Sequence, residues 1–377
     1  MPEPIQTAAA RGPERSRRRP ATRGAPRGFT LTEMLVSMAV LALILVLTTN
    51  MVSGTQKTLR TARSSAAQFR EARRAFETVT RTIGQATLNT YWDYDDPQTP
   101  TQYLRQSELH FVTGPAEDLL DSEDTYTHGI FFVAPFGFAG SDATGENIGT
   151  DPYRNLESLL NAWGYYIKFN DTDDDAPPFI RDLQQGNPPV VSVKKGFRLM
   201  EYRQPSEELT IYKDKLREKD NDGRSSFYQW FREELEENSR VVADNIIALV
   251  VRPVVSEQDA RKSSRDPWWI APEYTYDSRQ FQWGGRNDLS LTSRNQVPPV
   301  LELTLVAVDE SSYIAYERRN PSSDPRTVIS DLLENRFKEA EKLTEDLDSL
   351  ELGLSDLGIS HRVFSASVGL RTAKWSE

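Results

Sequence analysis

A long apolar segment near the N-terminus constrains this chain more than any other feature. Residues 29–47 contain only four polar side chains, namely two threonines, one serine and Glu33. As a helix these residues would span roughly 28 Å at about 1.5 Å per residue, close to the thickness of a bilayer's hydrocarbon core. A carboxylate in such a segment is unfavourable unless something compensates its charge. Glu33 therefore suggests a helix that meets a partner.

The charge of the chain is divided sharply between its two ends. Formal charge is −11 overall, and residues 1–28 hold seven arginines and two glutamates, a net charge of +5, which leaves −16 for residues 29–377. The positive-inside rule places the arginines in the cytoplasm and the acidic body outside. An acidic body argues against a nucleic-acid partner, because phosphate contacts need a basic surface. The chain has no cysteine, which excludes disulfides, thiolate metal sites and cysteine nucleophiles.

Three interpretations of the N-terminus compete. A secretory signal peptide needs a small-residue cleavage site after the apolar run, and Val52-Ser53-Gly54 is a poor one. A plain signal anchor would leave Glu33 as a solvated residue near the interface. The third interpretation is a prepilin-type signal, in which a basic leader ends in glycine before the apolar helix. We favour the third, because residues 28–33 read Gly-Phe-Thr-Leu-Thr-Glu.

With that motif and the apolar run behind it, the chain resembles the type IV pilin-like family of pilins and pseudopilins. The resemblance implies that prepilin peptidase cuts after Gly28 and N-methylates the new N-terminal Phe29. It also implies that Glu33, the fifth mature residue, pairs with the N-terminal amine of a neighbouring subunit and sets the axial register of a filament. The physical chemistry agrees, because Glu33 lies about one helical turn after the new amine. The leader of 28 residues is longer than most in the family.

The helix is expected to continue beyond the membrane, from near Phe29 to near Asn89, with Gly54 and Gly84 as weak points. After Gly54 the apolar residues recur at three- and four-residue spacing, which predicts one stripe that packs on a sheet. The stripe comprises Leu59, Ala62, Ala66, Phe69, Ala72, Phe76, Val79 and Ile83. We therefore divide the chain into a basic leader (1–28), a transmembrane half-helix (29–54), an amphipathic half-helix (55–90) and an exported globular domain (91–377).

The globular domain is expected to be a mainly antiparallel sheet, which makes the fold α+β. Short apolar runs predict strands at residues 108–112, 129–134, 165–169, 197–202, 241–251, 300–308 and 363–370. Helices are expected at 225–237 and, as an extra helix near the C-terminus, at 324–352 with Asp324 as N-cap and Pro325 at N1. The layout is similar to minor pseudopilins of the J type or pilus proteins of the W type, and to the Verru_Chthon cassette protein C family.

Two acidic segments are candidate calcium sites, the one cofactor that we consider. Carboxylates on alternate loop residues suit this hard cation, and the candidates are Asp171, Asp173 and Asp175 in one segment and Asp220 and Asp222 in the other. The second segment resembles the first half of an EF-hand loop, but its twelfth position is Gln229 instead of glutamate. Solvated acidic turns remain the alternative for both.

Residues 253–299 form a long connection rich in aromatic side chains. Trp268, Trp269 and Trp283 are candidate contacts with another subunit, because tryptophan is enriched at interface anchors. The alternative is that these rings fill a small core of their own. The three histidines, His110, His128 and His361, are isolated in sequence and are expected to be structural.

We expect a structural protein without enzymatic activity, since no nucleophile elbow, P-loop or dinucleotide fingerprint occurs. The resemblance implies a minor pilin or pseudopilin of a type II secretion or type IV pilus-like machine, and the large body suggests a tip or priming role. Its partners would be prepilin peptidase, other pilin-like subunits and inner-membrane lipid. A membrane-anchored periplasmic binding protein that never polymerises is the main alternative; an anchored hydrolase is a third.

Overall fold

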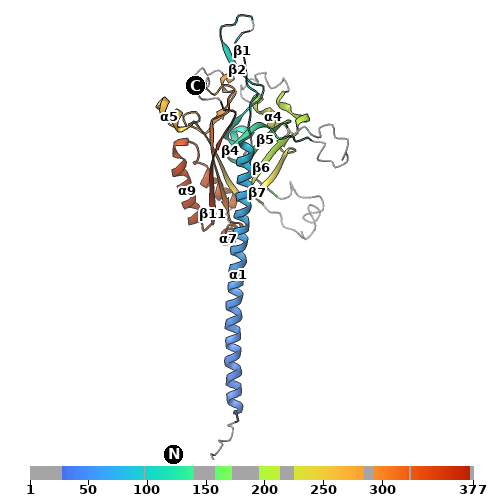
Figure 1. Cartoon of the computed structure of the whole chain (residues 1–377). Helices are drawn as coiled ribbons and strands as arrows, with labels where there is room; N and C mark the ends of the chain where they lie inside the picture. Colours follow the sequence, from blue (N-terminus) through green and yellow to red (C-terminus); the bar gives the residue numbers. More distant parts are fainter. Residues whose placement is uncertain are drawn as a thin grey trace, which may run out of the picture. The chain divides into compact units, whose positions relative to one another are not determined.

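The computed structural model describes residues 28–96, 98–139, 158–171, 195–212, 225–283, 292–321 and 324–373 (Figure 1). The chain divides into two compact units, Met1–Arg60 and Thr61–Glu377. A long N-terminal helix is followed by antiparallel sheets and by helices near the C-terminus. The predicted α+β class is confirmed.

Helix α1 spans Leu31–Ile83, 53 residues. It passes through Gly54 without interruption and ends one residue before Gly84. The predicted end near Asn89 is therefore six residues too late. The predicted apolar stripe is also too long: Leu59 is 51% exposed, and burial begins at Phe69 and Ala72. Only the last four turns of α1 pack against the sheets.

The second unit contains a six-stranded sheet, in which each neighbouring pair is antiparallel, with the order β7-β6-β5-β4-β3-β9. The strands are β3 (Val112–Pro115), β4 (Thr125–Pro135), β5 (Leu160–Asp171), β6 (Lys195–Gln204), β7 (Ser239–Asp244) and β9 (Tyr276–Asp277). The predicted strand at 108–112 is wrong except at Val112. Just before Val112, the backbone N–H of Phe111 donates to the side-chain oxygen Ser278 Oγ at 3.1 Å and not to the carbonyl of a neighbouring strand.

A three-stranded antiparallel sheet has the order β11-β10-β8. Its strands are β8 (Ile246–Val254), β10 (Val300–Val308) and β11 (His361–Gly369). The predicted strand at 241–251 is wrong as one element, because β7 and β8 belong to different sheets. Asn245 separates them with a left-handed backbone (φ 59°), which asparagine tolerates better than most residues and which interrupts regular strand geometry.

Side chains from β4 join the two sheets at the edge of β8. The β4–β5 pairing shifts register between Tyr126 and Ile130, and Thr127 in this irregularity has φ 55°. Leu249 N donates to Thr127 Oγ1 at 3.0 Å, and Val251 N donates to His128 Nδ1 at 3.0 Å. Two backbone donors of β8 thus find side-chain acceptors where no neighbouring strand pairs with them.

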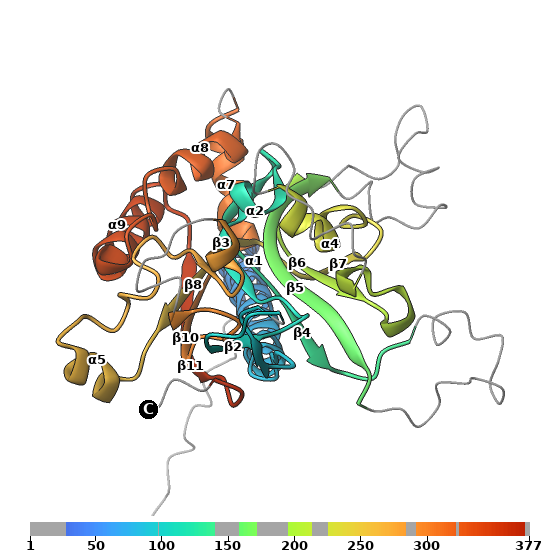
Figure 2. The same cartoon turned by 90° about the horizontal axis from the view of Figure 1, so that it is seen from above.

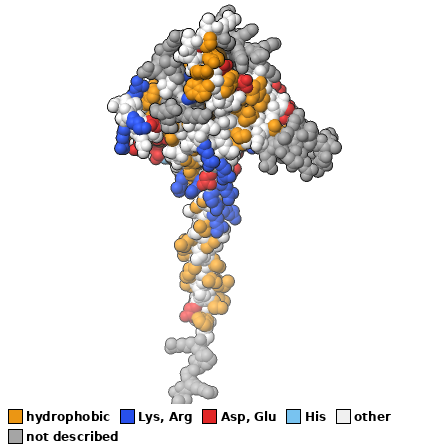
Figure 3. All heavy atoms as spheres, turned by 45° about the horizontal axis from the view of Figure 1, so that its top comes forward, with side chains coloured by type: hydrophobic (Ala, Val, Ile, Leu, Met, Phe, Trp, Pro, Cys, Tyr) orange, Lys and Arg blue, Asp and Glu red, His pale blue; other side chains and the backbone are white. Residues whose placement is uncertain are grey.

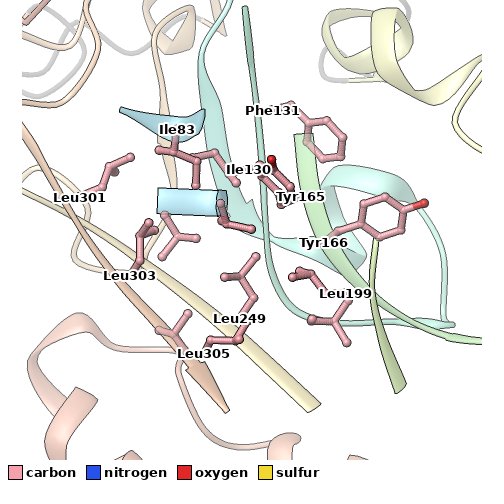
Figure 4. Close-up of a cluster of buried hydrophobic side chains, with 14 of the residues drawn as sticks. Ile83, Ile130, Phe131, Tyr165, Tyr166, Leu199, Leu249, Leu301, Leu303 and Leu305 are labelled. Carbon is pink, nitrogen blue, oxygen red and sulfur yellow. The ribbon is translucent and has the colours of Figure 1, made fainter. Parts of the chain in front are cut away.

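The core of the second unit forms where the end of α1 meets both sheets. Figure 4 shows Ile83 between the leucines of β10 on one side and Ile130 and Tyr165 on the other. Ile83, Leu303 and Ile130 are fully buried. Phe76 of α1 packs against Phe364 of β11 with ring centroids 6.2 Å apart. The predicted packing of the amphipathic half-helix on a sheet is confirmed for its last four turns only.

The predicted helix at 324–352 is two helices, α8 (Pro325–Leu333) and α9 (Leu343–Asp356), joined through the 3-10 turn η7 (Ala340–Lys342). Asp324 caps α8 as predicted, since its side chain accepts from Arg326 N at 3.1 Å. The break contains Phe337 (φ 58°), whose N donates to Asp346 at 2.8 Å. In the view from above, α8 and α9 lie along the outside of β8, β10 and β11 (Figure 2).

The predicted helix at 225–237 is much shorter in the structure, with only η5 (Ser225–Tyr228) and α4 (Gln229–Arg232). Several elements were not predicted. They are β1 (Tyr91–Tyr94), β2 (Tyr103–Gln106), α2 (Ala116–Leu120), α5 (Glu257–Ser263), α7 (Glu310–Arg319) and the 3-10 turns η2 (Ser206–Glu208), η3 (Thr210–Tyr212) and η6 (Gln280–Trp283). The connection at 253–299 thus contains regular secondary structure, because α5, β9 and η6 lie within it.

Candidate processing and assembly site

The N-terminal part of α1 presents an apolar surface with no protein packed against it. Its most apolar 18-residue window has a mean hydropathy of 2.3, and none of that window is buried. By length and composition this helix can cross a membrane, as Figure 3 illustrates by the apolar side chains along it. A single apolar helix near the N-terminus fits a membrane anchor that carries a soluble C-terminal domain.

Glu33 lies in the first turn of α1 and bonds back to the residue that starts the helix. Thr30 N donates to Glu33 Oε2 at 2.8 Å, and Thr30 Oγ1 donates to the same oxygen at 2.8 Å. Glu33 N in turn donates to Thr30 Oγ1 at 3.3 Å. This reciprocal pattern is a capping box, which satisfies backbone donors that a helix start leaves unpaired. The capping role of Thr30 was not predicted from the sequence, although Thr-x-x-Glu is the signature of a capping box.

The capping box gives Glu33 two hydrogen-bond donors within its own chain. A carboxylate near a helix N-terminus is also favoured by the helix dipole, whereas a positive amine there is not. Cleavage after Gly28 would place such an amine on Phe29, directly before Thr30. Glu33 is thus positioned where it would offset an amine created at this end of the helix, whether from its own chain or from a neighbour.

Gly28 and Phe29 lie just before the helix. A Cβ atom at Gly28 would meet nothing within 4 Å, so the fold itself does not require glycine at this position. Phe29 is 82% exposed. A requirement for glycine at residue 28 would therefore come from recognition by a processing enzyme.

The calcium candidates fall almost entirely outside the described residues. Asp173, Asp175, Asp220 and Asp222 lie there, and Asp171 is the last residue of β5. Within the described part of the chain, no group of three or more His, Asp or Glu residues could hold a metal ion. Calcium binding stays a prediction.

Two of the three candidate tryptophans, Trp268 and Trp269, pack partly against the body. Trp268 and Trp269 are half-buried, with Arg252 5.3 Å from the ring centre of Trp268 and Arg265 4.5 Å from that of Trp269. Trp283 ends η6. Their role as partner contacts also stays a prediction.

His110 and Asp277 form a buried pair that invites comparison with a catalytic dyad. His110 Nε2 lies 2.7 Å from Asp277 Oδ1, and Trp230 Nε1 donates to His110 Nδ1 at 3.0 Å. Because the indole only donates, Nε2 carries the proton and donates to Asp277. Burial lowers the pKa of His110. Both ring nitrogens are occupied and neither side chain is exposed, so the pair serves packing.

His128 is the second buried histidine. Its Nδ1 accepts from Val251 N, and its Nε2 therefore donates to Phe337 O at 3.0 Å. Burial lowers its pKa to about 4. His361 is half-buried, with Nε2 3.7 Å from Glu351. In this structure all three histidines have structural contacts.

A hairpin that the sequence analysis missed exposes several aromatic side chains. Strands β1 and β2 pair antiparallel, with Trp92 opposite Arg105 and Tyr94 opposite Tyr103. The Tyr94 and Tyr103 rings stack with centroids 4.8 Å apart, and Trp92 is 64% exposed. Asp95 stabilises the turn by accepting from Thr101 N at 2.9 Å. The alternating aromatics on either side of a turn-rich stretch were the available signal.

Comparison with known proteins identifies one feature. The family model for the prokaryotic N-terminal methylation motif matches residues 24–49. No curated protein and no solved structure matches this chain. The motif indicates a prepilin-type substrate of prepilin peptidase and supports a relationship with the type IV pilin-like family, which agrees with the exposed apolar helix and the position of Glu33.

Proposed function

We propose that this chain is a minor pilin or pseudopilin subunit of a type II secretion or type IV pilus-like filament. The observation that carries the proposal is the methylation motif at residues 24–49, which coincides with an exposed apolar helix that begins at Leu31. Prepilin peptidase would cut after Gly28 and methylate the amine of Phe29. The chain would then join other pilin-like subunits through α1, as a structural component and not as an enzyme.

Before assembly the chain would lie in the inner membrane as a single-pass protein. Its basic leader would face the cytoplasm and its acidic body the periplasm or the exterior, as the positive-inside rule predicts. The subunit type within the machine, whether J-like, W-like or of the Verru_Chthon cassette protein C kind, is part of the proposal. The antiparallel sheets packed on α1 support a pilin-like body.

Glu33 would change partners on assembly. In the free chain it bonds Thr30, and in a filament it would pair with the Phe29 amine of a neighbour. A charge pair is far less unfavourable in lipid than a single charge, which gives subunits that meet in register an advantage over those that do not.

The test is co-purification of other pilin-like subunits with the full-length chain from membranes. We expect Glu33→Ala to abolish it, because the neighbour's amine loses its counter-charge. Thr30→Ala removes the capping hydroxyl but keeps the carboxylate, so association should persist. Ser37→Ala, one turn further along, is the matched control. If Glu33→Ala co-purifies like the unaltered chain, the proposed role of Glu33 is wrong, and a chain that never associates would be the non-polymerising anchored binding protein.

A further inference from the structure

Helix α1 carries a basic stripe on the side opposite its buried face. We define the α1 basic stripe as Arg63, Arg70, Arg74 and Arg81, which are spaced so that all four lie on one side of a helix. All four are exposed, whereas Ala72, Phe76, Val79 and Ile83 are buried on the other side. Figure 3 shows arginine and lysine side chains gathered on this helix.

The positive charge of the stripe contrasts with the residues that follow it in the chain. Residues 61–81 hold five arginines and two glutamates, a net charge of +3, while residues 82–377 carry −20. Glu77 is paired with Arg73 at 2.9 Å. Among the described residues, no carboxylate forms an ion pair with Arg63, Arg74 or Arg81. Two such stripes repel each other, so this side of α1 suits an acidic surface and not a second α1.

Helix α9 presents a matching acidic stripe. We define the α9 acidic stripe as Glu345, Asp348, Leu352 and Asp356, which lie on one side of α9. The three acids are exposed, and Leu352 is 67% exposed in their midst. The opposite side of α9 buries Leu343, Leu350 and Leu354. The helix has no basic residue of its own in its last turn, and Arg319 donates to Leu357 O at 3.2 Å at its C-terminal end.

The two stripes also agree in length. Arg70 to Arg81 and Glu345 to Asp356 are both eleven residues apart, about 16 Å along a helix. If the two stripes met, an arginine of one would face an acid of the other at each end. Leu352 would pack between these ends on the aliphatic stem of an arginine, which would make the contact continuous. The exposure of both stripes shows that the contact is not made within one chain.

We propose that the α1 basic stripe binds the α9 acidic stripe of a second copy of this chain. The contact would act beside the membrane-embedded register that Glu33 supplies, and in that respect it rests on the proposed function. Because this contact lies outside the membrane, the attraction between its opposite charges would determine which side of a neighbouring subunit faces α1. The chain would then occur as adjacent copies and not as an isolated subunit.

The absence of cysteine makes the contact directly testable by cross-linking of the full-length chain in neutral detergent micelles. One chain carries Thr78→Cys, an exposed position between Arg74 and Arg81, and a second carries Leu352→Cys. We expect a disulfide-linked heterodimer on mixing and oxidation. The matched control pairs Thr78→Cys with Ser263→Cys on exposed α5, which should give none. Neutral micelles lack anionic headgroups, so a cross-link there identifies a protein partner and not a lipid surface.

Charge reversal distinguishes the proposed contact from chance encounter. Glu345→Arg with Asp356→Arg in the Leu352→Cys chain should lower the dimer yield roughly tenfold, as should about 0.5 M salt, because exposed ion pairs are screened. Adding Arg70→Glu and Arg81→Glu to the Thr78→Cys chain should restore it. No dimer, or a dimer indifferent to reversal and salt, overturns the proposal. The mature N-terminus, determined on the same samples, reports independently on the proposed function.

Discussion

Replacing His128 with leucine tests whether this side chain joins the two sheets. His128 is 1% exposed, accepts from Val251 N in β8 and donates to Phe337 O in the break between α8 and α9. Leucine has a similar volume but can make neither bond, so a buried N–H and a buried C=O lose their partners. Each such loss costs about 1–3 kcal/mol. We expect His128→Leu to lower the free energy of unfolding by about 2–6 kcal/mol.

The assay is urea unfolding of the full-length chain in detergent micelles, followed by tryptophan fluorescence. His361→Leu is the matched control, because His361 is only half-buried and lies 3.7 Å from its carboxylate partner. It should change stability by less than about 1 kcal/mol. If His128→Leu unfolds at the same urea concentration as the unaltered chain, the side-chain junction between β4 and β8 does not stabilise the fold.

Three further predictions follow from the same core. The folded chain keeps His128 neutral with a pKa of about 4, whereas an unfolded histidine titrates near 6.5. The free energy of unfolding should therefore decrease as the pH is lowered from 6.5 to 4, by up to about 3 kcal/mol. Urea unfolding at several pH values that gives the same pH dependence for His128→Leu as for the unaltered chain would contradict this. Gly164→Ala places a Cβ 2.3 Å from the Phe131 ring and should destabilise the body by at least about 2 kcal/mol, whereas Gly196→Ala, with nothing within 4 Å, should be nearly neutral in thermal unfolding. Asn245→Ala should cost about 1 kcal/mol at its left-handed backbone and Asn245→Gly almost nothing; equal melting temperatures would refute the argument.

Strand β10 shows what local pattern predicts well. Its bounds, Val300–Val308, match the prediction. An apolar residue at every second position is typical of a strand that turns one face toward the core. The helix predicted from Phe29 onward was also confirmed, since apolar length and the absence of proline are properties of the segment itself. The N-cap at Asp324 could also be predicted, because it depends only on Asp324 and the residues directly after it.

The misplaced elements depended on distant partners. The break between α8 and α9 is held by Phe337, whose carbonyl bonds His128, 209 positions away. The split at Asn245 left its two neighbouring strands in separate sheets. Asp244 and Asn245 interrupt the apolar run there, but their polarity alone does not say that the strands on either side join different sheets. The two arms of the exposed hairpin have four residues each, so their alternating aromatics give only a weak periodic signal.

The residues of the candidate site could be singled out locally, although their roles stay predictions. Gly28, Phe29 and Glu33 belong to a contiguous motif, and the family match at residues 24–49 covers them. The capping role of Thr30 was not predicted, although Thr30 and Glu33 have the spacing of a capping box at the start of α1. The α1 and α9 stripes could be read as helical patterns, but their exposure required the packed body.

The mature N-terminus tests the central claim most directly. The full-length chain, produced in cells that contain prepilin peptidase and recovered from membranes, would be analysed by mass spectrometry of its N-terminal peptide. The account predicts a chain that begins with N-methylated Phe29. An intact leader ahead of Gly28 would indicate a plain membrane anchor, a start at Thr55 would indicate a secreted protein, and either result would contradict the account.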